Sequence, residues 1–437
     1  MSYPADRGRA LEGVRVLDFT TGWSGPIGAR FLADLGAEVI KIESMYGRGA
    51  AQVPTPENPK DYAKIAHSMY PDNDPGDQPY NRYGTFNEYH RNKKSLTLDL
   101  SRDDCRELAR RLVPISDVVM ENFSARVMRN FGLDYPSIRH LNPAIIFVSM
   151  PGFGMTGPHR NHVSYGTNIE PTAGFSNLMG YPGPKPYKSG EAYPDPNAGL
   201  NAVGATLAAL YYRRRSGKGQ FIDLSQNEAA ACLIGEALLG YQLTGEHPMR
   251  MGNHHGYHAP HNAYKCKGDD NWVAIAVTND EEWAALCSVA GNPSWASDPR
   301  FQDQLSRWQR QDDIDRHISE WTANEDYKDL MHRLQGAGVT AAAVYTNQDV
   351  VEDEHLNERG YFWDTEHAAA GTMPFSGAPV LLSKTPGTLI SSAPLMGEHN
   401  RYVLEDMAGL ETSYVDSLEA EAAIGTRPPE GIAGIFA

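Results

Sequence analysis

Apolar positions in the first part of the chain follow two alternating periods. Residues 14–20, VRVLDFT, form a β-branched run, and apolar residues then recur at helical spacing between Gly25 and Gly36. A second strand-like run, AEVIKIE, follows at 37–43. A strand, a helix and a strand within about 30 residues form the βαβ unit of a parallel sheet. Such a sheet binds ligands beyond the carboxyl ends of its strands.

The same alternation continues along the chain. Further strands are expected at SLTLDL, DVVMEN, AIIFVSM and QFIDLS, and further helices at 103–113 and at about 196–215. The pattern predicts an α/β fold with a large Rossmann-like domain at 1–225 and a linker helix at 226–249. Residues 250–345 combine the strand NWVAIAV with amphipathic helices and predict a smaller α+β domain. A linker and a C-terminal segment are expected at 346–437.

Residues 45–90 interrupt the pattern. They are rich in Pro, Asn, Asp, Gly and Tyr without a clear period, so a long excursion from the sheet is expected. Its aromatic residues either line an acyl pocket or pin the excursion to the body of the protein. These residues are Tyr62, Tyr70, Tyr80, Tyr83, Phe86 and Tyr89.

Composition excludes several classes of protein. The chain has 437 residues, 41% hydrophobic and 22% charged, as expected for a globular protein of two or three domains. Its formal net charge of −16 argues against nucleic acid and membrane partners. The four cysteines are widely separated, and no signal pattern or apolar run of about 18 residues is visible. A cytoplasmic protein with reduced thiols is expected.

The turn GWSGPIG at 22–28 is a weak binding signal. It lacks the G-x-G-x-x-G spacing of dinucleotide sites, and Trp23 fills space that a pyrophosphate needs. A tight turn into a helix is therefore preferred to an NAD site. Neither a Walker A motif nor a G-x-S-x-G nucleophile elbow is present.

Asp195 is the candidate catalytic residue. It precedes Pro196 and a long apolar-periodic segment, which predicts an N-cap position with Pro196 at N1. A structural cap is one interpretation. In the other, the helix dipole keeps the carboxylate ionised and directed at a ligand, where it acts as the nucleophile on a thioester. The local sequence leaves both open.

Basic residues and histidines gather in three places. The segment 91–94 with Arg102, and Arg126 with Arg129, suit nucleotide phosphates, although basic residues at helix ends also complement helix dipoles. Four histidines lie within eight residues, at positions 254, 255, 258 and 261. Their glycine-rich surroundings favour a mobile lid, and because no cysteine or carboxylate completes a ligand set, no metal is expected.

Several segments spread over nearly the whole chain resemble one known family. They are LEGVRVLDFT, GP at 25–26, LGAEVIKIE, NKKSLTLDL, ENF at 121–123, LNPAIIFVSMPGFGMTGP, SGKGQFIDLS, GNHHGYHAPHNAYKCKGDD and LMGEHN. Together they resemble the class III CoA-transferases, which include formyl-CoA transferase, carnitine CoA-transferase and the α-methylacyl-CoA racemases.

The resemblance implies an enzyme that moves coenzyme A from an acyl-CoA to a carboxylic acid. It implies an aspartyl anhydride and an aspartyl-CoA thioester as intermediates, with CoA esters as substrates and no tightly bound cofactor. The implied fold is a Rossmann-like large domain completed by the C-terminal segment, a smaller domain, and an interlocked dimer. A homodimer is expected, and a mixed dimer with a paralogous subunit is the alternative.

The resemblance also assigns site residues. Asp195 in YPDPNAGL matches the position of the catalytic aspartate, and Tyr165 is placed in the substrate pocket. Contacts with CoA carry over to Trp23, Ser24, Leu98, Arg102, Asn122 and Arg129. The lid loop comprises Gly252, Asn253, His254, His255 and Gly256.

Two departures from the family pattern limit what is implied. The racemase branch requires a His-Asp pair where this chain has SYGTN at 164–168, so a racemase is disfavoured, although it stays an alternative. A non-catalytic CoA-binding subunit is the other alternative. Trp23 and Ser44 depart from the formyl-CoA transferase pattern, so specificity for formate or oxalate is not implied.

Overall fold

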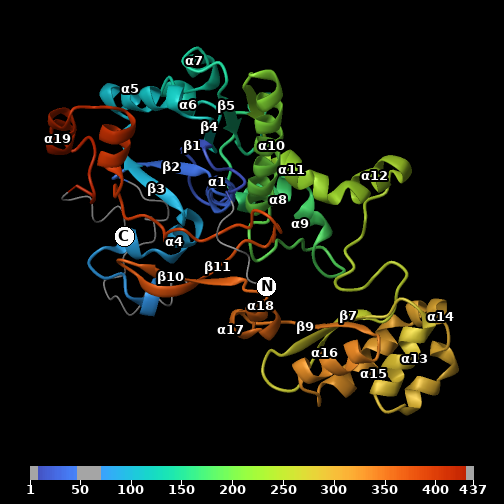
Figure 1. The fold of residues 1–437 in the computed structure, drawn as a ribbon. Coiled ribbons are helices and arrows are strands. Elements are labelled where there is room, and N and C mark those ends of the chain that lie inside the picture. Colours follow the sequence, from blue (N-terminus) through green and yellow to red (C-terminus); the bar gives the residue numbers. More distant parts are fainter. Residues whose placement is uncertain (1–7, 47–69, 430–437) are drawn as a thin grey trace. The chain divides into compact units, whose positions relative to one another are not determined.

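The computed structural model describes residues 8–46 and 70–429, which form two compact units (Figure 1). Unit 1 comprises Met1–Phe175, Lys188–Leu239 and Asn357–Ala437, within the described residues. Unit 2 comprises Ser176–Tyr187 and Gly240–Leu356. Each unit has a hydrophobic core of its own.

Unit 1 is built on a parallel sheet of six strands. The strands are β1 (Arg15–Asp18), β2 (Glu38–Glu43), β3 (Lys93–Thr97), β4 (Val118–Glu121), β5 (Ile146–Ser149) and β6 (Gln220–Asp223). They are arranged in the order β3-β2-β1-β4-β5-β6, and every pairing is parallel. This is the order of doubly wound nucleotide-binding sheets, whose direction switches between β1 and β4. The predicted α/β class is therefore confirmed.

Alternate residues of the strands feed two cores, one on each face of the sheet. Leu17 of β1 faces helix α5 (Asp103–Leu112), the π-helical turn Tyr402–Met407 and α19 (Thr412–Ala420). Val16, its neighbour, faces α1 (Ser24–Asp34) and α10 (Pro194–Ser216). Because both faces are covered, β4 and β5 are buried at every position.

Glycines allow helices α1 and α10 to cross in close contact. A Cβ atom on Gly28 of α1 would lie 2.9 Å from the carbonyl oxygen of Gly199 in α10. A Cβ atom on Gly199 would lie 2.5 Å from the carbonyl oxygen of Ser24. The two backbones can approach this closely only because neither glycine has a side chain. The contact brings the first turns of both helices together.

The described part of the 45–90 excursion contains helices that the sequence pattern did not show. They are α3 (Pro79–Arg82) and α4 (Gly84–His90), each too short to display a helical period. The α4 helix is fixed by burial of Phe86 and His90, whose rings stack with centroids 4.0 Å apart. Tyr62 lies outside the described residues.

The predicted helix after β6 is interrupted. It consists of α11 (Gln226–Ala231), a 3₁₀ turn at Cys232–Ile234 and α12 (Gly235–Thr244). The other described helices of unit 1 and its boundary segments are α6 (Val127–Asn130), α7 (Tyr135–Ile138), α8 (Gly166–Thr172), α9 (Phe175–Leu178) and α18 (Glu354–Glu358). Strands β10 (Phe362–His367) and β11 (Gly371–Ser376) form an antiparallel hairpin in unit 1.

Unit 2 contains an antiparallel sheet of three strands in the order β7-β8-β9. The strands are β7 (His261–Lys265), β8 (Trp272–Ala276) and β9 (Thr340–Ala343). Its helices are α13 (Asp280–Val289), α14 (Gln304–Gln309), α15 (Gln311–Thr322), α16 (Tyr327–Gly336) and α17 (Asn347–Glu352). Their apolar faces enclose a core around Ile275, Leu286 and Ile318. Across the described residues, every helix is too short or too polar to cross a membrane.

Candidate active site

A cavity of about 940 Å³ lies at the carboxyl ends of the parallel strands in unit 1. Its lining residues include Trp23 after β1, Ser44 after β2, Leu98 after β3 and Asn122 after β4. Helices α4, α6, α8, α10 and α11 and the loops beside them contribute further parts of the wall. The cavity therefore includes the switch point between β1 and β4, where doubly wound sheets bind their ligands.

Asn122 joins the loops that follow β1 and β4. Its Oδ1 accepts a hydrogen bond from the backbone N–H of Thr21 at 2.8 Å, and its Nδ2 donates to the carbonyl oxygen of Thr21 at 2.8 Å. The same Nδ2 donates to Oγ of Ser24 at 3.0 Å. Ser24 is fully buried at the first position of α1. The amide of Asn122 thus fixes the Ser24 hydroxyl at the start of α1.

The structure corrects the predicted N-cap position of Asp195. Helix α10 begins at Pro194, Tyr193 occupies the N-cap position, and no side chain caps the helix. Pro194 can take the N1 position because its φ suits a first helical residue and it has no N–H to satisfy. Asp195 therefore lies inside the first turn, and it lines the cavity.

The surroundings of Asp195 alter its acidity. Burial raises the pKa of its carboxyl to about 6, while hydrogen bonding from the hydroxyl and backbone N–H of Ser24 acts in the opposite direction. The group is consequently ionised at neutral pH but incompletely solvated. The first turns of α1 and α10 meet here, so the positive ends of both helix dipoles lie near the carboxylate.

Gly166 lies directly against the Asp195 carboxylate. A Cβ atom at this first position of α8 would overlap Oδ2 of Asp195 and would lie 2.6 Å from Cβ of Ala192. Only glycine leaves the carboxylate in its present place. The preceding residue, Tyr165, lines the cavity and is 75% exposed, while its backbone N–H donates to Oδ1 of Asn168 at 2.6 Å.

The cavity brings together most of the predicted unit 1 site residues. Its lining includes Trp23, Ser24, Leu98, Asn122, Tyr165 and Asp195. Arg102 and Arg129 are not among the lining residues. Arg102 forms ion pairs with Asp104 at 2.7 Å and with Glu421 at 2.5 Å, and Arg129 is exposed on the short helix α6. Their contacts with CoA stay predictions.

The aromatic residues of the excursion either line the cavity or pin the excursion to the body of unit 1, and their contact with an acyl group stays a prediction. Tyr83, Phe86 and Tyr89 line the cavity, and Tyr89 stacks on Trp23 with ring centroids 6.0 Å apart. Tyr70 is buried against Tyr83 and belongs to a small cluster that pins the excursion. Tyr80 is not a lining residue.

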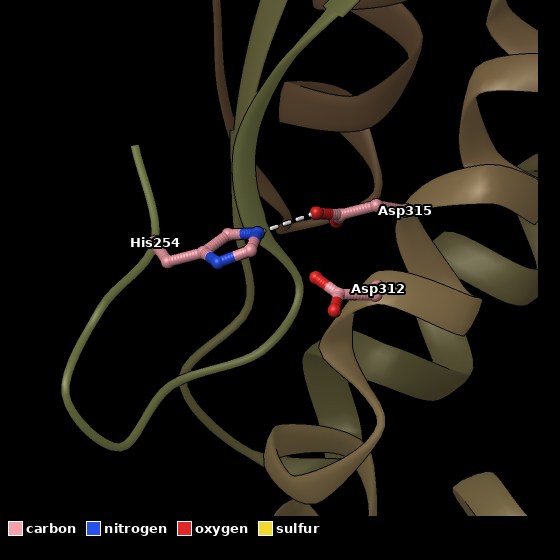
Figure 2. Close-up of side chains that lie close together, drawn as sticks. All are labelled: His254, Asp312 and Asp315. Atoms are coloured by element: carbon pink, nitrogen blue, oxygen red, sulfur yellow. Dashed lines mark hydrogen bonds and ion pairs between the residues drawn. The ribbon is translucent and has the colours of Figure 1, made fainter. Parts of the chain in front are cut away.

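The histidine-rich loop belongs to unit 2, where it is tied to β7 and α15. Nε2 of His254 lies 2.6 Å from Oδ2 of Asp315. Figure 2 shows this pair with Asp312 beside it. Asp315 also accepts hydrogen bonds from Asn262 Nδ2 at 2.7 Å and from the hydroxyl of Tyr264 at 2.6 Å. Both oxygens of Asp315 thus already accept hydrogen bonds from β7, and one of them also holds His254 of the loop.

These contacts overturn the expectation that no carboxylate accompanies the histidines. Potential ligand atoms of His254, Asp312 and Asp315 lie within 4.8 Å of one another. The two aspartates follow the histidine by about 60 residues, so local spacing could not reveal them.

Further contacts within unit 2 shape the rest of the loop. Gly252 has a φ of +63°, and its N–H donates to the carbonyl oxygen of Gly180 at 2.9 Å. Nδ1 of His261 is 2.7 Å from the carbonyl oxygen of Asn253. Trp308 Nε1 donates to the carbonyl oxygen of His255 at 3.2 Å, next to Gly256, the last residue of the predicted lid. The role of residues 252–256 as a lid stays a prediction.

Sequence reasoning missed Phe123, Gln226 and the steric role of Gly166 in the cavity. Gln226 opens α11 directly after β6, so its position beyond the end of a parallel strand was the available signal. The proximity of Gly166 to Asp195 had no such signal, because the two residues are 29 positions apart in the sequence.

Comparisons with known proteins agree with this arrangement. A family model described as CoA-transferase family III matches residues 11–400. The chain is 32% identical to a succinyl-CoA–D-citramalate CoA-transferase of Chloroflexus aurantiacus, over 95% of this chain and 98% of that protein. It is 30% identical to a succinate–glutarate CoA-transferase of Agrobacterium fabrum, over 92% of this chain and 96% of that protein. A crystal structure of a CAIB/BAIF family protein from Brucella suis matches with a TM-score of 0.79 and 30% identity, covering 92% of this chain and 100% of that one.

Proposed function

Since the chain belongs to CoA-transferase family III and transfers coenzyme A between acyl-CoA esters and carboxylic acids, we propose that Asp195 is the nucleophile of this transfer. The position of its carboxylate carries the proposal. The group lines the cavity at the carboxyl ends of the sheet, is half-buried, and lies where α1 and α10 begin. A desolvated carboxylate at such a place is ionised at neutral pH and open to attack a bound thioester.

The proposed reaction consists of acyl exchanges at the Asp195 carboxyl. A carboxylate oxygen attacks the thioester carbon of the donor, and the C–S bond breaks to leave a mixed anhydride and the CoA thiolate. The thiolate attacks the aspartyl carbonyl of this anhydride, so the donor acid leaves as its carboxylate and Asp195 becomes a CoA thioester. The acceptor carboxylate then attacks this thioester, and the released thiolate takes the acceptor's acyl group from the new anhydride. No net proton is consumed.

The surrounding residues stabilise the charges that these steps create. Negative charge moves between a carboxylate, a thiolate and tetrahedral oxyanions, all close to the first turns of α1 and α10. Backbone N–H groups at helix starts stabilise such charge without reorganising during the reaction. Ser24 adds a hydroxyl held by Asn122. Burial of the site also limits the access of water to the anhydride.

We assign the remaining predicted residues around this centre. Trp23, Leu98 and Asn122 line the cavity along β1, β3 and β4, which supports contacts between them and the CoA moiety. Arg102 and Arg129 would meet its phosphates. The 252–256 loop would cover the intermediates. Because two relatives are named for succinate or succinyl-CoA, we propose succinyl-CoA as the first donor to be tried.

An adduct on Asp195 tests the nucleophile directly. Wild-type protein incubated with succinyl-CoA and no acceptor should form an aspartyl-CoA thioester on the peptide that contains Asp195. The thioester is detected by mass spectrometry and is converted to a hydroxamate by hydroxylamine. Asp195→Ala should give no adduct, whereas Glu191→Gln, which removes another cavity carboxylate, should still give one. An adduct on Glu191 in the wild type would contradict the assignment.

The exposed surface of α12 supports a dimer. No residue of this helix is buried, and Leu238, Leu239 and Leu243 are 45%, 56% and 76% exposed. An apolar helix left uncovered is typical of an association surface. We propose that α12 is covered by a second copy of the chain in an interlocked dimer.

Light scattering on the purified chain tests the dimer. It should give the mass of two chains, and Leu239→Asp with Leu243→Asp should weaken the association. A wild-type monomer that gains activity only with a paralogous subunit would support the mixed dimer instead.

A further inference from the structure

Gln226 lines the cavity that holds Asp195 and has a buried polar atom without a hydrogen-bond partner in the described part of the chain. Its side chain lines the cavity and the residue is only 5% exposed. Nε2 donates to the carbonyl oxygen of Met150 at 2.7 Å, which identifies the nitrogen end of the amide. Oε1 has no hydrogen-bond partner within the described part of the chain. The wall of the cavity thus includes a residue whose buried hydrogen-bond acceptor has no donor in the described part of the chain.

The backbone around Gln226 holds this atom in place. The backbone N–H of Gln226 donates to the carbonyl oxygen of Pro151 at 3.3 Å, and that of Asn227 donates to Gly152 at 2.9 Å. Ser225 caps the helix by accepting the N–H of Glu228 at 3.2 Å. Because a buried polar atom that lacks a partner destabilises a protein, its retention on a fixed element points to a partner supplied by the ligand.

The position of Gln226 in the sheet indicates which part of the ligand meets it. The lining residues assigned to CoA follow β3, β1 and β4, whereas Gln226 follows β6 at the opposite edge. Helices α10 and α11 pack together, with Nδ2 of Asn197 donating to the carbonyl oxygen of Ala229 at 2.9 Å. Gln226 therefore belongs to the wall formed by α10 and α11, which also carries Asp195. Because the acyl group is bonded to the carbon that Asp195 attacks, we place it beside this wall, with the thiol end of CoA toward Ser24.

We infer that one of the two acids exchanged by this enzyme carries a hydroxyl group, which donates a hydrogen bond to Oε1 of Gln226. The inference rests on the proposed function of Asp195. A carboxylate or a thioester offers only acceptors, so an unsubstituted acid leaves Oε1 unpaired. A site built to bind a substrate hydroxyl rejects the analogue that lacks it, because the buried group then has no partner. Gln226 is thus a specificity-determining residue.

Matched pairs of acids test this role. With succinyl-CoA as donor, kcat/KM is measured for lactate against propionate and for citramalate against methylsuccinate. The wild type should prefer at least one hydroxylated acid by about 10- to 100-fold. In Gln226→Met, which has a similar volume and no strong acceptor, the preference should fall to near unity. Asn227→Leu, a change to the neighbouring amide that is not part of the cavity wall, should keep the wild-type preference.

Three outcomes would overturn the inference. The first is that the wild type has the same kcat/KM for both members of every pair, a result that needs no variant and so does not depend on the folding of Gln226→Met. The second is that the preference for the hydroxylated acid is kept in Gln226→Met. The third is that kcat/KM falls by the same factor for both members of a pair in Gln226→Met, as expected if Oε1 binds an N–H of CoA or a water molecule. Incubation with succinyl-CoA and no acceptor separates the two proposals. If no adduct forms on Asp195, the proposed function is wrong. If the adduct forms and any of these three outcomes is also seen, only the role of Gln226 is refuted.

Discussion

Replacing Asp195 by Asn should lower turnover by about 10⁴-fold or more while the protein still folds and binds acyl-CoA. The amide has nearly the same shape as the carboxyl, but it cannot attack the thioester, so the first step of the exchange is lost. Reversion by deamidation is blocked, because the succinimide route needs a backbone N–H on the next residue and Pro196 has none. Turnover is measured by mass spectrometry of the CoA esters.

The same variant should be more stable than the wild type at neutral pH. Folding raises the pKa of Asp195 from 3.8 to about 6, so the folded state retains a proton that the unfolded state loses. The contribution of this proton to the free energy of unfolding is complete below pH 3.8 and is lost as the pH rises through about 6. Asn has no charge to desolvate. The free energy of unfolding of Asp195→Asn should therefore exceed that of the wild type by up to about 3 kcal/mol at pH 8 and by about half of that at pH 5.

Urea unfolding at the two pH values checks the change in the free energy of unfolding. The control is Asp269→Asn, which replaces an exposed aspartate of unit 2. Equal gains at pH 5 and pH 8 would show that the carboxylate is not desolvated. Transfer activity within tenfold of the wild type in Asp195→Asn would remove Asp195 from the chemistry altogether.

Substitution of Gly166 by Ala should lower kcat by about 10²-fold or more with little change in the affinity for CoA. The new methyl group would occupy the space of Oδ2 of Asp195, so the carboxylate must rotate away from its position beside Ser24. Trp23, Leu98 and Asn122, for which we propose contacts with CoA, are not among the nearest neighbours of the new methyl group. The measurements are steady-state kinetics and calorimetric titration with CoA.

Gly190→Ala is the matched control for this substitution, because a Cβ atom at position 190 meets no atom within 4 Å. Adding Ala192→Gly to Gly166→Ala removes the second overlap but leaves the carboxylate displaced. Activity should therefore stay low in the double variant. Recovery of full activity there would assign the effect to Ala192 rather than to Asp195.

The layered fold was predictable because its strands and helices carry strong local signals. Val16 and Leu17 face opposite cores, and such two-sided burial produces the β-branched runs from which parallel strands were expected. Helix α4 was not predictable, since seven residues contain too few turns to show a period. The start of α10 was misplaced because Pro194 and Pro196 both suit position N1, and the sequence alone does not choose between them.

The candidate site was predictable only in part. The resemblance identified Asp195 and the cavity residues Trp23, Leu98 and Asn122. It could not supply contacts between distant positions, such as Asp315 with His254 or Gly166 with Asp195. Those depend on how helices from separate parts of the chain pack, and no local pattern of residue types encodes that packing.

The glycine contact between α1 and α10 constrains how this enzyme can be redesigned. Ser24 and Asp195 lie on two helices whose backbones are in contact at Gly28 and Gly199. A larger residue at this crossing should therefore separate the Ser24 hydroxyl from the carboxylate that we propose as the nucleophile. New acid preferences should therefore be sought at Tyr165 and Gln226, whose replacement leaves that crossing unaltered. Libraries that randomise the crossing itself should yield mainly inactive proteins.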